Sequence, residues 1–218
     1  MIFIKVNETM DQKKRNFQKE LEEVIERIDK DNPPSLLLHS CCGPCSSYCL
    51  EYLSEYFKIT VLYYNPNIYP PEEFEIRAKE QEKFIEQFPA KNKITYILGE
   101  YNPEEFYDMA KGLEDLPEGE TRCFKCYRQR LEKAADLAQK QGFDYFTTTL
   151  SISPLKRSDK LNEIGEELSS LYEVKHLPSD FKKKNGYKRS TELSKEYNMY
   201  RQDYCGCEFS YKARHPEG

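Results

Sequence analysis

Three pairs of cysteines that lie far apart in the sequence constrain this chain most. They are Cys41-Cys42, Cys123-x-x-Cys126 and Cys205-Gly-Cys207. The three pairs make sense together only if the fold gathers them at one site. Soft thiolates gathered in this way hold zinc, an iron–sulfur cluster or a redox disulfide. We therefore interpret the three pairs as one redox metal site.

Composition predicts a soluble protein that works in a reducing compartment. The 218 residues are enough for one α/β domain with a sizeable core. No apolar stretch is long enough to span a bilayer, and residues 1–6 are too short for the core of a signal peptide. We thus expect a cytoplasmic protein without a membrane partner. In such a compartment cysteines are metal ligands or catalytic thiols more often than disulfides, although Cys49 reads as a buried small hydrophobe.

Charge is distributed unevenly along the chain. The net charge of −5 argues against strong binding of polyanions by the whole surface. From Lys175 to Gly218, however, ten Lys or Arg face six Asp or Glu. This asymmetry is typical of a nucleic-acid face at the end of the chain.

Apolar runs and helical periodicities alternate along the sequence, which predicts a doubly wound, largely parallel α/β sheet. We expect residues 1–34 to form an N-terminal amphipathic helix, residues 35–218 a single catalytic α/β domain, and residues 180–218 a basic, mostly helical tail that returns to the active site. The expected strands are 35–39, 58–64, 94–98, 143–150 and 173–177. The expected helices are 10–30, 44–57, 72–88, 103–111, 121–141, 159–171 and 191–197.

Cys41 and Cys42 then fall at the carboxyl end of the first strand. Nucleotide-binding α/β proteins carry a glycine-rich phosphate loop in this position. The chain has neither GxGxxG nor a Walker sequence, so we predict no dedicated nucleotide site. Thiols occupy that place instead.

Basic and aromatic residues in the tail and in one loop favour contact with RNA. Lysines interleaved with aromatics hold phosphates and stack on splayed bases, although a charge run is usually only a solvated face. The segment 63–71 after the second strand is rich in Pro and Tyr, as in a ligand loop or in a turn packed by its tyrosines. The candidate RNA contacts are Tyr64, Tyr69, Lys182, Lys183, Lys184, Tyr187, Arg201 and Tyr204.

The cysteine spacings leave the metal open. Cys123 and Cys126 lie on one face at the start of a helix, where the N-terminus lowers thiol pKa. With two thiolates from a distant loop they suit zinc or a [4Fe–4S] cluster, and adjacent cysteines favour iron. A disulfide across one residue, as in Cys205-Gly-Cys207, is strained and easily reduced. That pair is a redox relay or, alternatively, two more metal ligands.

Several motifs together resemble the QueH-type epoxyqueuosine reductases over residues 35–210. They are His39-x-Cys-Cys-Gly-Pro-Cys45, Asn65-Pro-Asn-Ile68, Arg122-Cys-x-x-Cys-Tyr127, Thr148-Thr-Leu-x-x-Ser-Pro154, Asp180-Phe-Lys-Lys183 with Gly186-Tyr187, and Tyr200-Arg-Gln-x-Tyr-Cys-Gly-Cys207. The resemblance implies a sheet of the nucleotide-alpha-hydrolase (HUP-like) type. It also implies the last step of queuosine synthesis, which removes the epoxide oxygen from epoxyqueuosine at the wobble position of tRNA.

The resemblance further implies how the thiols are used. A [4Fe–4S] cluster would be held by Cys41, Cys42, Cys123 and Cys126, and Cys205 with Cys207 would form the redox-active pair. A second, mononuclear iron beside the cluster is implied, with Cys45 as its candidate ligand, and cobalamin is not. The sequence does not identify the electron donor.

Removing an epoxide oxygen also needs protons. His39, Tyr204 and Asp180 are candidate donors, although His39 beside a strand end is as often a structural hydrogen-bonding residue. Two rival functions stay open at this point: a heterodisulfide-reductase-like thiol enzyme and a zinc-stabilised RNA-binding protein.

Overall fold

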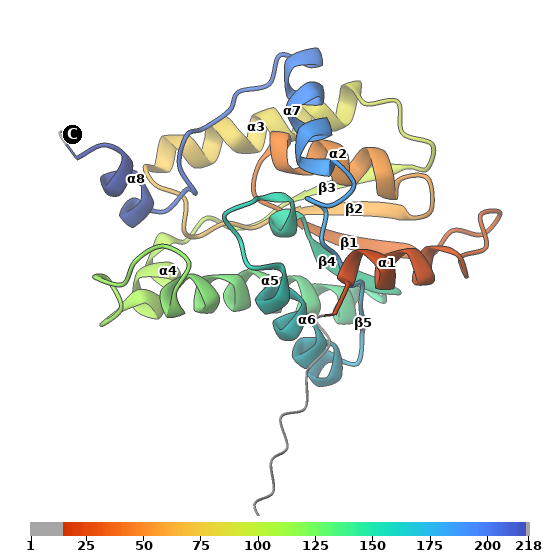
Figure 1. Ribbon diagram of the computed structural model, residues 1–218, viewed down its shortest axis with the longest axis horizontal. Coiled ribbons are helices and arrows are strands. Elements are labelled where there is room, and N and C mark those ends of the chain that lie inside the picture. Colours follow the sequence, from red (N-terminus) through yellow and green to blue (C-terminus); the bar gives the residue numbers. More distant parts are fainter. Residues whose placement is uncertain (1–14, 217–218) are drawn as a thin grey trace, which may run out of the picture.

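The computed structural model describes residues 15–216 and contains five strands and eight α-helices within them (Figure 1). None of these helices is long and apolar enough to cross a membrane. The strands are β1 Ser35–Ser40, β2 Lys58–Tyr63, β3 Ile94–Leu98, β4 Tyr145–Thr148 and β5 Lys175–His176. The helices are α1 Phe17–Ile25, α2 Gly43–Leu53, α3 Pro71–Gln87, α4 Pro103–Ala110, α5 Thr121–Gln141, α6 Ser158–Tyr172, α7 Gly186–Glu196 and α8 Glu208–Arg214, with a 3₁₀ turn at Thr149–Ile152.

The five strands form one sheet in the order β3-β2-β1-β4-β5, and every neighbouring pair is parallel. This confirms the predicted doubly wound α/β fold. After β1 the chain builds β2 and β3 on one side, then crosses back to place β4 and β5 on the other. The carboxyl ends of β1 and β4 therefore border a topological switch point, where open α/β sheets bind their ligands.

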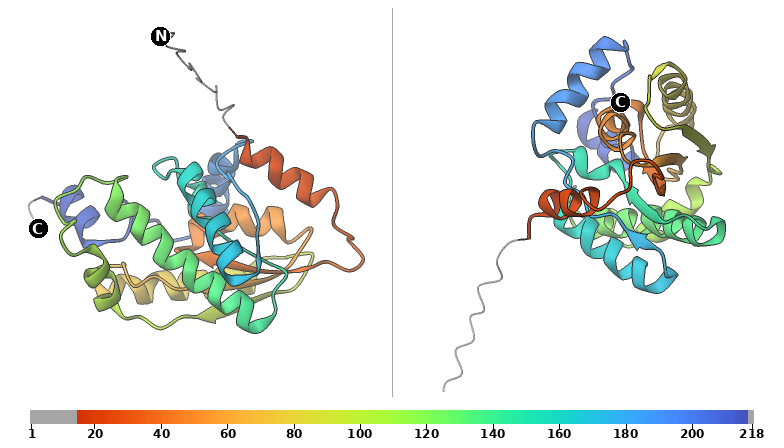
Figure 2. Two further views of the ribbon diagram at one scale, coloured as in Figure 1. Left: turned by 90° about the horizontal axis from the view of Figure 1, so that it is seen from below. Right: turned by 90° about the vertical axis from the view of Figure 1, so that its right-hand side faces the viewer.

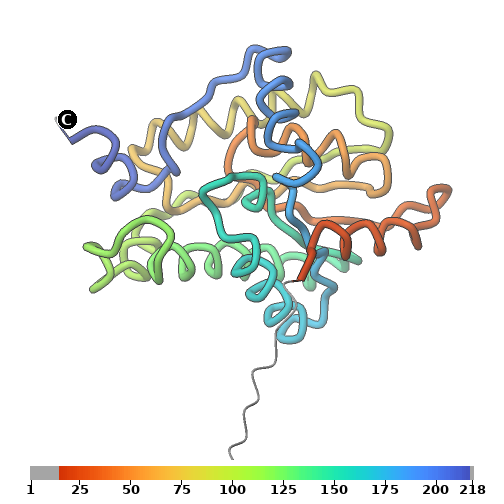
Figure 3. The backbone as a smooth tube through the Cα atoms, viewed as in Figure 1, coloured from red at the N-terminus to blue at the C-terminus, as the bar shows by residue number. Residues whose placement is uncertain are grey.

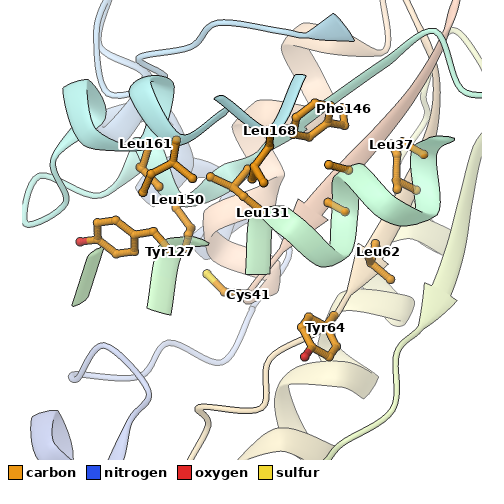
Figure 4. Close-up of a cluster of buried hydrophobic side chains, with 14 of the residues drawn as sticks. Leu37, Cys41, Leu62, Tyr64, Tyr127, Leu131, Phe146, Leu150, Leu161 and Leu168 are labelled. Carbon is orange, nitrogen blue, oxygen red and sulfur yellow. The ribbon is translucent and has the colours of Figure 1, made fainter. Parts of the chain in front are cut away.

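Alternate residues of the central strands enter two different cores. Leu37 packs with Leu62 and Phe146 against α5 and α6, as Figure 4 shows. Leu36 and Leu38 point the other way and pack against residues of α2 and α3. Because both faces of the sheet are covered, as the two views in Figure 2 show, the strands read as continuous apolar runs.

The N-terminal helix is shorter than predicted. α1 begins at Phe17 after the N-cap Asn16 and ends at Ile25, whereas the periodicity predicted a helix over 10–30. Residues 10–14 of that prediction lie outside the described residues. Leu21 of α1 is fully buried and belongs to the same core as Leu36, so the helix covers one side of the sheet.

Three sequence-based boundaries near the site are wrong. β4 spans only Tyr145–Thr148 because the Thr148 hydroxyl accepts a hydrogen bond from the Leu150 amide at 3.1 Å, which starts a 3₁₀ turn. β5 is a two-residue strand that follows Glu173 in the left-handed region (φ 52°). α7 begins at Gly186, five residues before the expected start, and α8 was not predicted at all.

Gly186 lets α7 approach α2 closely. A Cβ atom at this position would lie 1.9 Å from the Phe181 carbonyl oxygen and 2.4 Å from the Tyr48 ring. We expect Gly186→Ala to lower the free energy of unfolding by about 1 to 3 kcal/mol, because a backbone atom cannot move aside as a side chain can. Chemical denaturation checks this, with the exposed Lys195→Ala on the same helix as the control. Equal stability of the two variants would contradict the close packing.

Candidate thiol and metal site

A cavity of about 350 Å³ opens at the switch point. Segments that are distant in the sequence line it: the loop after β1, the turn after β4, the start of α7 and the C-terminal segment. Figure 3 shows the chain after α7 passing the start of α3 before it enters α8, and the Tyr69 amide donates to the Gly206 carbonyl at 2.8 Å there. Residues of the lining that matter below are Cys41, Cys45, Lys156, Tyr187, Arg201, Tyr204, Cys205 and Arg214.

The loop after β1 carries a compact group of three thiols. The sulfur atoms of Cys41, Cys42 and Cys45 all lie within 4.8 Å of one another. Cys42 is the N-cap of α2, and its sulfur accepts a hydrogen bond from the Cys45 amide at 3.4 Å. Pro44 at the first turn has no N–H to satisfy, so the helix begins directly after Cys42 and Cys45 lies in its first turn. The strand and the helix together fix the positions of the three sulfurs.

The three thiols have very different acidities. Hydrogen bonds from Cys42 and Cys45 hold the pKa of Cys41 well below its usual range. Burial and the neighbouring Cys41 raise the pKa of Cys42 to about 12. Contact with Cys41 and Cys42 also raises the pKa of Cys45. One thiolate is therefore favoured at this group, and further ionisation requires added positive charge such as a metal ion.

The Cys123-x-x-Cys126 pair lies in the first two turns of α5, as predicted, but outside the group of three sulfurs. The Gly119 amide donates to the Cys123 sulfur at 3.2 Å, and Cys126 shares a small buried cluster with Cys207. Burial raises the pKa of both thiols and outweighs the lowering expected from the helix N-terminus. That expectation is wrong for these two cysteines.

Cys205 and Cys207 occupy different surroundings, and all eight cysteines are free thiols. Cys205 lines the cavity, where the ammonium of Lys156 donates to its sulfur at 3.3 Å. Cys207 is buried at the N-cap of α8, and burial raises its pKa to about 12. The pair thus presents one accessible and one sheltered thiol.

Three cations surround the thiols, and none was singled out from the sequence. Arg77 and Arg130 are each 1% exposed, and Lys156 is half-buried. Burial works against the charge of each cation, yet the pKa of each is raised, chiefly through its electrostatic interaction with a nearby cysteine: Cys42 for Arg77, Cys126 for Arg130 and Cys205 for Lys156. For Arg130 the sequence did hold an indication of this position: it follows Cys126 by four residues, which puts both side chains on the same face of the helix.

His39 and Asp180 occupy structural positions outside the cavity lining. His39 is fully buried, and its ring nitrogens lie 2.9 Å from the Thr148 hydroxyl and 3.0 Å from the Tyr64 carbonyl oxygen. Burial lowers the pKa of His39 to about 4, so the ring is neutral and bridges β1, β4 and the loop after β2. Asp180 is also buried and pairs with Lys182 at 2.9 Å. Neither side chain lines this cavity.

The four candidate tyrosines differ in exposure. Tyr187 is 43% exposed and lines the cavity, and Tyr204 lines it from a more buried position. Tyr69 is half-buried and packs edge-to-face on Tyr211. Tyr64 is only 4% exposed, and its hydroxyl bonds to Glu105. We therefore withdraw Tyr64 as a stacking residue, because both its ring and its hydroxyl are already used inside the protein.

The candidate basic residues also separate into two kinds. Lys182 is bound internally, to Asp180 and to the carbonyl oxygens of Ser151 and Lys156 at 3.4 Å. Lys184 pairs with Glu22 of α1. Lys183 and Arg201 are exposed, and Arg201 lies at the cavity, as does Arg214, which was not predicted. Only the structure shows that Arg214 lies at the cavity, because the helix that carries it, α8, was not predicted.

Fold and site together define an α/β protein with a thiol-lined cavity at its topological switch point. The family model for the epoxyqueuosine reductase QueH matches residues 36–213. The chain belongs to this family of oxidoreductases.

Individual relatives agree over most of the chain. The epoxyqueuosine reductase QueH of Staphylococcus epidermidis is 45% identical, over 92% of this chain and 87% of the relative. The QueH of Streptococcus pyogenes is 43% identical, over 91% of this chain and 79% of the relative. The QueH of Thermotoga maritima is 36% identical, over 83% of this chain and 92% of the relative. A solved structure from Methanocaldococcus jannaschii, described as a predicted subunit of tRNA methyltransferase, aligns over 74% of each chain with 14% identity and a TM-score of 0.47.

The buried contacts of His39 predict a structural role that can be measured. We expect His39→Ala to lower the free energy of unfolding by about 2 to 4 kcal/mol, because it leaves a cavity and removes the partner of two buried polar groups. Thr148→Val leaves no large cavity but removes the hydrogen bonds of this hydroxyl to His39 and to the Leu150 amide, and it should cost about 1 to 3 kcal/mol. Denaturation of both variants checks this. A His39→Ala protein with wild-type stability would contradict this structural role.

Proposed function

We propose that this chain removes the epoxide oxygen of epoxyqueuosine at the wobble position of tRNA and leaves the cyclopentene of queuosine. One observation carries the proposal: thiols of two distant segments, Cys41 and Cys45 after β1 and Cys205 of the tail, line the switch-point cavity in a chain that belongs to the epoxyqueuosine reductase QueH family. The reaction takes up two electrons and two protons, breaks both C–O bonds of the epoxide and releases the oxygen as water. Cobalamin has no part in this proposal.

The thiols fit a soft metal centre. Cys41, Cys42 and Cys45 already bring their sulfurs within 4.8 Å of one another, and thiolate donors are those that iron–sulfur clusters use. We assign Cys41, Cys42, Cys123 and Cys126 as the residues that would hold a [4Fe–4S] cluster, and Cys45 as a ligand for a second iron. When bound, such a centre supplies one-electron transfer close to the cavity. Arg77, Arg130 and Lys156 supply the positive charge that several buried thiolates require.

Cys205 and Cys207 are suited to supply the electron pair. Oxidation of the two thiols to one disulfide releases two electrons and two protons, which balances the removal of one oxygen as water. An external reductant must then restore the dithiol after each turnover. Lys156 and Tyr204 line the same cavity, and we assign them to proton donation to the departing oxygen; the Tyr204 hydroxyl would have to leave its hydrogen bond to the Tyr69 carbonyl oxygen to do so.

The cavity has a size suited to a splayed nucleotide base, since ligand pockets typically start near 300 Å³. Tyr187 at its rim is exposed and available for stacking. Arg201, Arg214 and Lys183 are exposed cations that we assign to tRNA phosphates. We infer that the anticodon loop enters over α7 and α8, whose residues form this rim.

The reaction is tested by anaerobic turnover of epoxyqueuosine-containing tRNA with iron-reconstituted protein and a chemical reductant. We expect queuosine in the digested nucleosides by mass spectrometry. Cys123→Ser and Cys205→Ser should abolish product, because each removes a thiol that the reaction requires. Cys49→Ser is the matched control: Cys49 is fully buried in the core against α2 and does not line the cavity, and a serine hydroxyl can keep the hydrogen bond of this thiol to the Cys45 carbonyl oxygen.

The outcome separates the proposed function from its rivals. Absence of queuosine from protein with verified iron would contradict the proposal and favour reduction of a small disulfide. Protein that takes up only zinc and binds tRNA without turnover would favour an RNA-binding protein.

Binding of tRNA at the cavity rim is tested by salt dependence. We expect Arg201→Ala and Arg214→Ala each to weaken binding and to reduce the slope of log affinity against log salt by about 1, because each removes one phosphate contact. Lys140→Ala, at the opposite end of α5 from the thiol pair, should leave both unchanged. Filter binding over a salt series checks this. Unchanged slopes in the two arginine variants would place the RNA elsewhere.

A further inference from the structure

Leu155 is a large apolar side chain that the structure leaves in solvent at the edge of the cavity. It is 63% exposed, and it lines the cavity together with its neighbours Pro154 and Lys156. A single exposed leucine is common on protein surfaces and needs no explanation by itself. Leu155 differs because an exposed residue of a cavity lining lies at the rim. A substrate that reaches the thiols therefore passes beside it.

The turn that carries Leu155 is braced by hydrogen bonds. The ammonium of Lys182 donates to the carbonyl oxygens of Ser151 and Lys156, each at 3.4 Å, and so ties both ends of the turn to one point. Within the turn, the Leu155 and Lys156 amides donate to the hydroxyl and the carbonyl oxygen of Ser153 at 3.3 Å and 3.2 Å. The backbone thus presents Leu155 in one position, and a ligand that binds there loses little affinity to ordering of this turn.

The residue that follows Leu155 turns inward. The ammonium of Lys156 donates to the Cys205 sulfur at 3.3 Å, whereas Leu155 stays exposed. One short turn therefore joins a group at the thiols to a group at the rim. A substrate ring that reaches Lys156 has Leu155 directly outside it.

The rim around Leu155 combines apolar surface with positive charge. Tyr187, 43% exposed, lines the cavity from the start of α7. Arg201 and Arg214 line it from the tail, and both are exposed. Bases contact apolar and aromatic surface, and phosphates contact cations. The rim therefore suits a single strand of nucleic acid better than an apolar protein segment.

Two acidic side chains also line the cavity, and each has a partner in the protein. The Asp203 carboxylate lies 3.3 Å from the ring of His215. The Glu118 carboxylate accepts a hydrogen bond from the Ser210 hydroxyl at 3.2 Å. Both carboxylates are thus held by side chains of the tail, which leaves contact with phosphates to the arginines.

We propose that Leu155 is a wedge that enters the anticodon loop and fills the place left in its base stack when the modified nucleotide moves into the cavity. This inference deepens the proposed function and rests on it. Moving a base out of a stack costs free energy, and an apolar side chain that takes its place restores part of the lost contact. Tyr187 and the two arginines hold flanking bases and phosphates, whereas Leu155 acts on the stack itself.

The probe is an anticodon stem–loop RNA with epoxyqueuosine at the wobble position and 2-aminopurine directly 3′ of it. Stacking quenches the fluorescence of 2-aminopurine, so the signal rises when the neighbouring base leaves the stack. The iron-reconstituted full chain is mixed with this RNA at saturating protein without added reductant. The variants are Leu155→Ala, Leu155→Met and the matched control Leu171→Ala. Leu171 is 62% exposed near the end of α6 and does not line the cavity.

We expect wild type and Leu171→Ala to raise the fluorescence equally. Leu155→Met should retain most of the rise, because methionine is apolar and of similar volume, whereas Leu155→Ala should lose about half of it or more. In turnover of tRNA, Leu155→Ala should lower kcat/KM by roughly tenfold. The salt slope of tRNA binding should keep its wild-type value in Leu155→Ala, since this side chain contacts no phosphate.

Wild-type fluorescence and wild-type kcat/KM in Leu155→Ala would overturn the proposal. So would reduced turnover with a full rise in fluorescence, because the nucleotide would then leave the stack without Leu155. The exposed position makes Leu155→Ala a variant that folds, and an unchanged melting temperature verifies this. A failure of the proposed function looks different: wild-type protein with verified iron would then form no queuosine from tRNA.

Discussion

The structure depends on balancing buried thiolates with buried cations. Desolvation alone favours neutral thiols, and it raises the pKa of Cys42, Cys123, Cys126 and Cys207. Several thiolates can coexist in such a place only if positive charge is built into the same core. Arg77 and Arg130 provide it from α3 and α5, and Lys156 provides it from the turn after β4.

Sheet topology determines where the buried cations and the thiols come together. β1 and β4 are neighbours although more than one hundred residues separate them, and their parallel pairing puts both carboxyl ends at one edge. The Cys41–Cys45 loop and Lys156 meet there as a result. The tail then reaches the same edge through the Tyr69–Gly206 hydrogen bond. Thus the switch point, the usual ligand site of such folds, gathers segments from the whole chain.

Much of the fold and some of the site were predictable from residues alone. Continuous apolar runs such as 35–39 identify buried parallel strands, and the bounds of β3 and α5 were predicted correctly. The thiols were recognisable because cysteine clusters are rare and chemically specific. By contrast, the roles of His39 and Tyr64 depend on burial and partners, which periodicity does not report. Both were placed among the functional candidates, and the structure uses both internally.

The sequence by itself determined the order of the strands and of the described helices other than α8, the family and the residue types that can carry redox chemistry, because these follow from local pattern and from cysteine spacing. Only the tertiary structure decided which cysteine sulfurs lie close together, which lysines form ion pairs inside the protein and which cations lie near the thiols. Arg77 illustrates the reason. In the sequence it is one charged residue of a polar helix, and its burial beside Gly206 and Tyr204 arises only from contacts between segments that the chain brings together on folding.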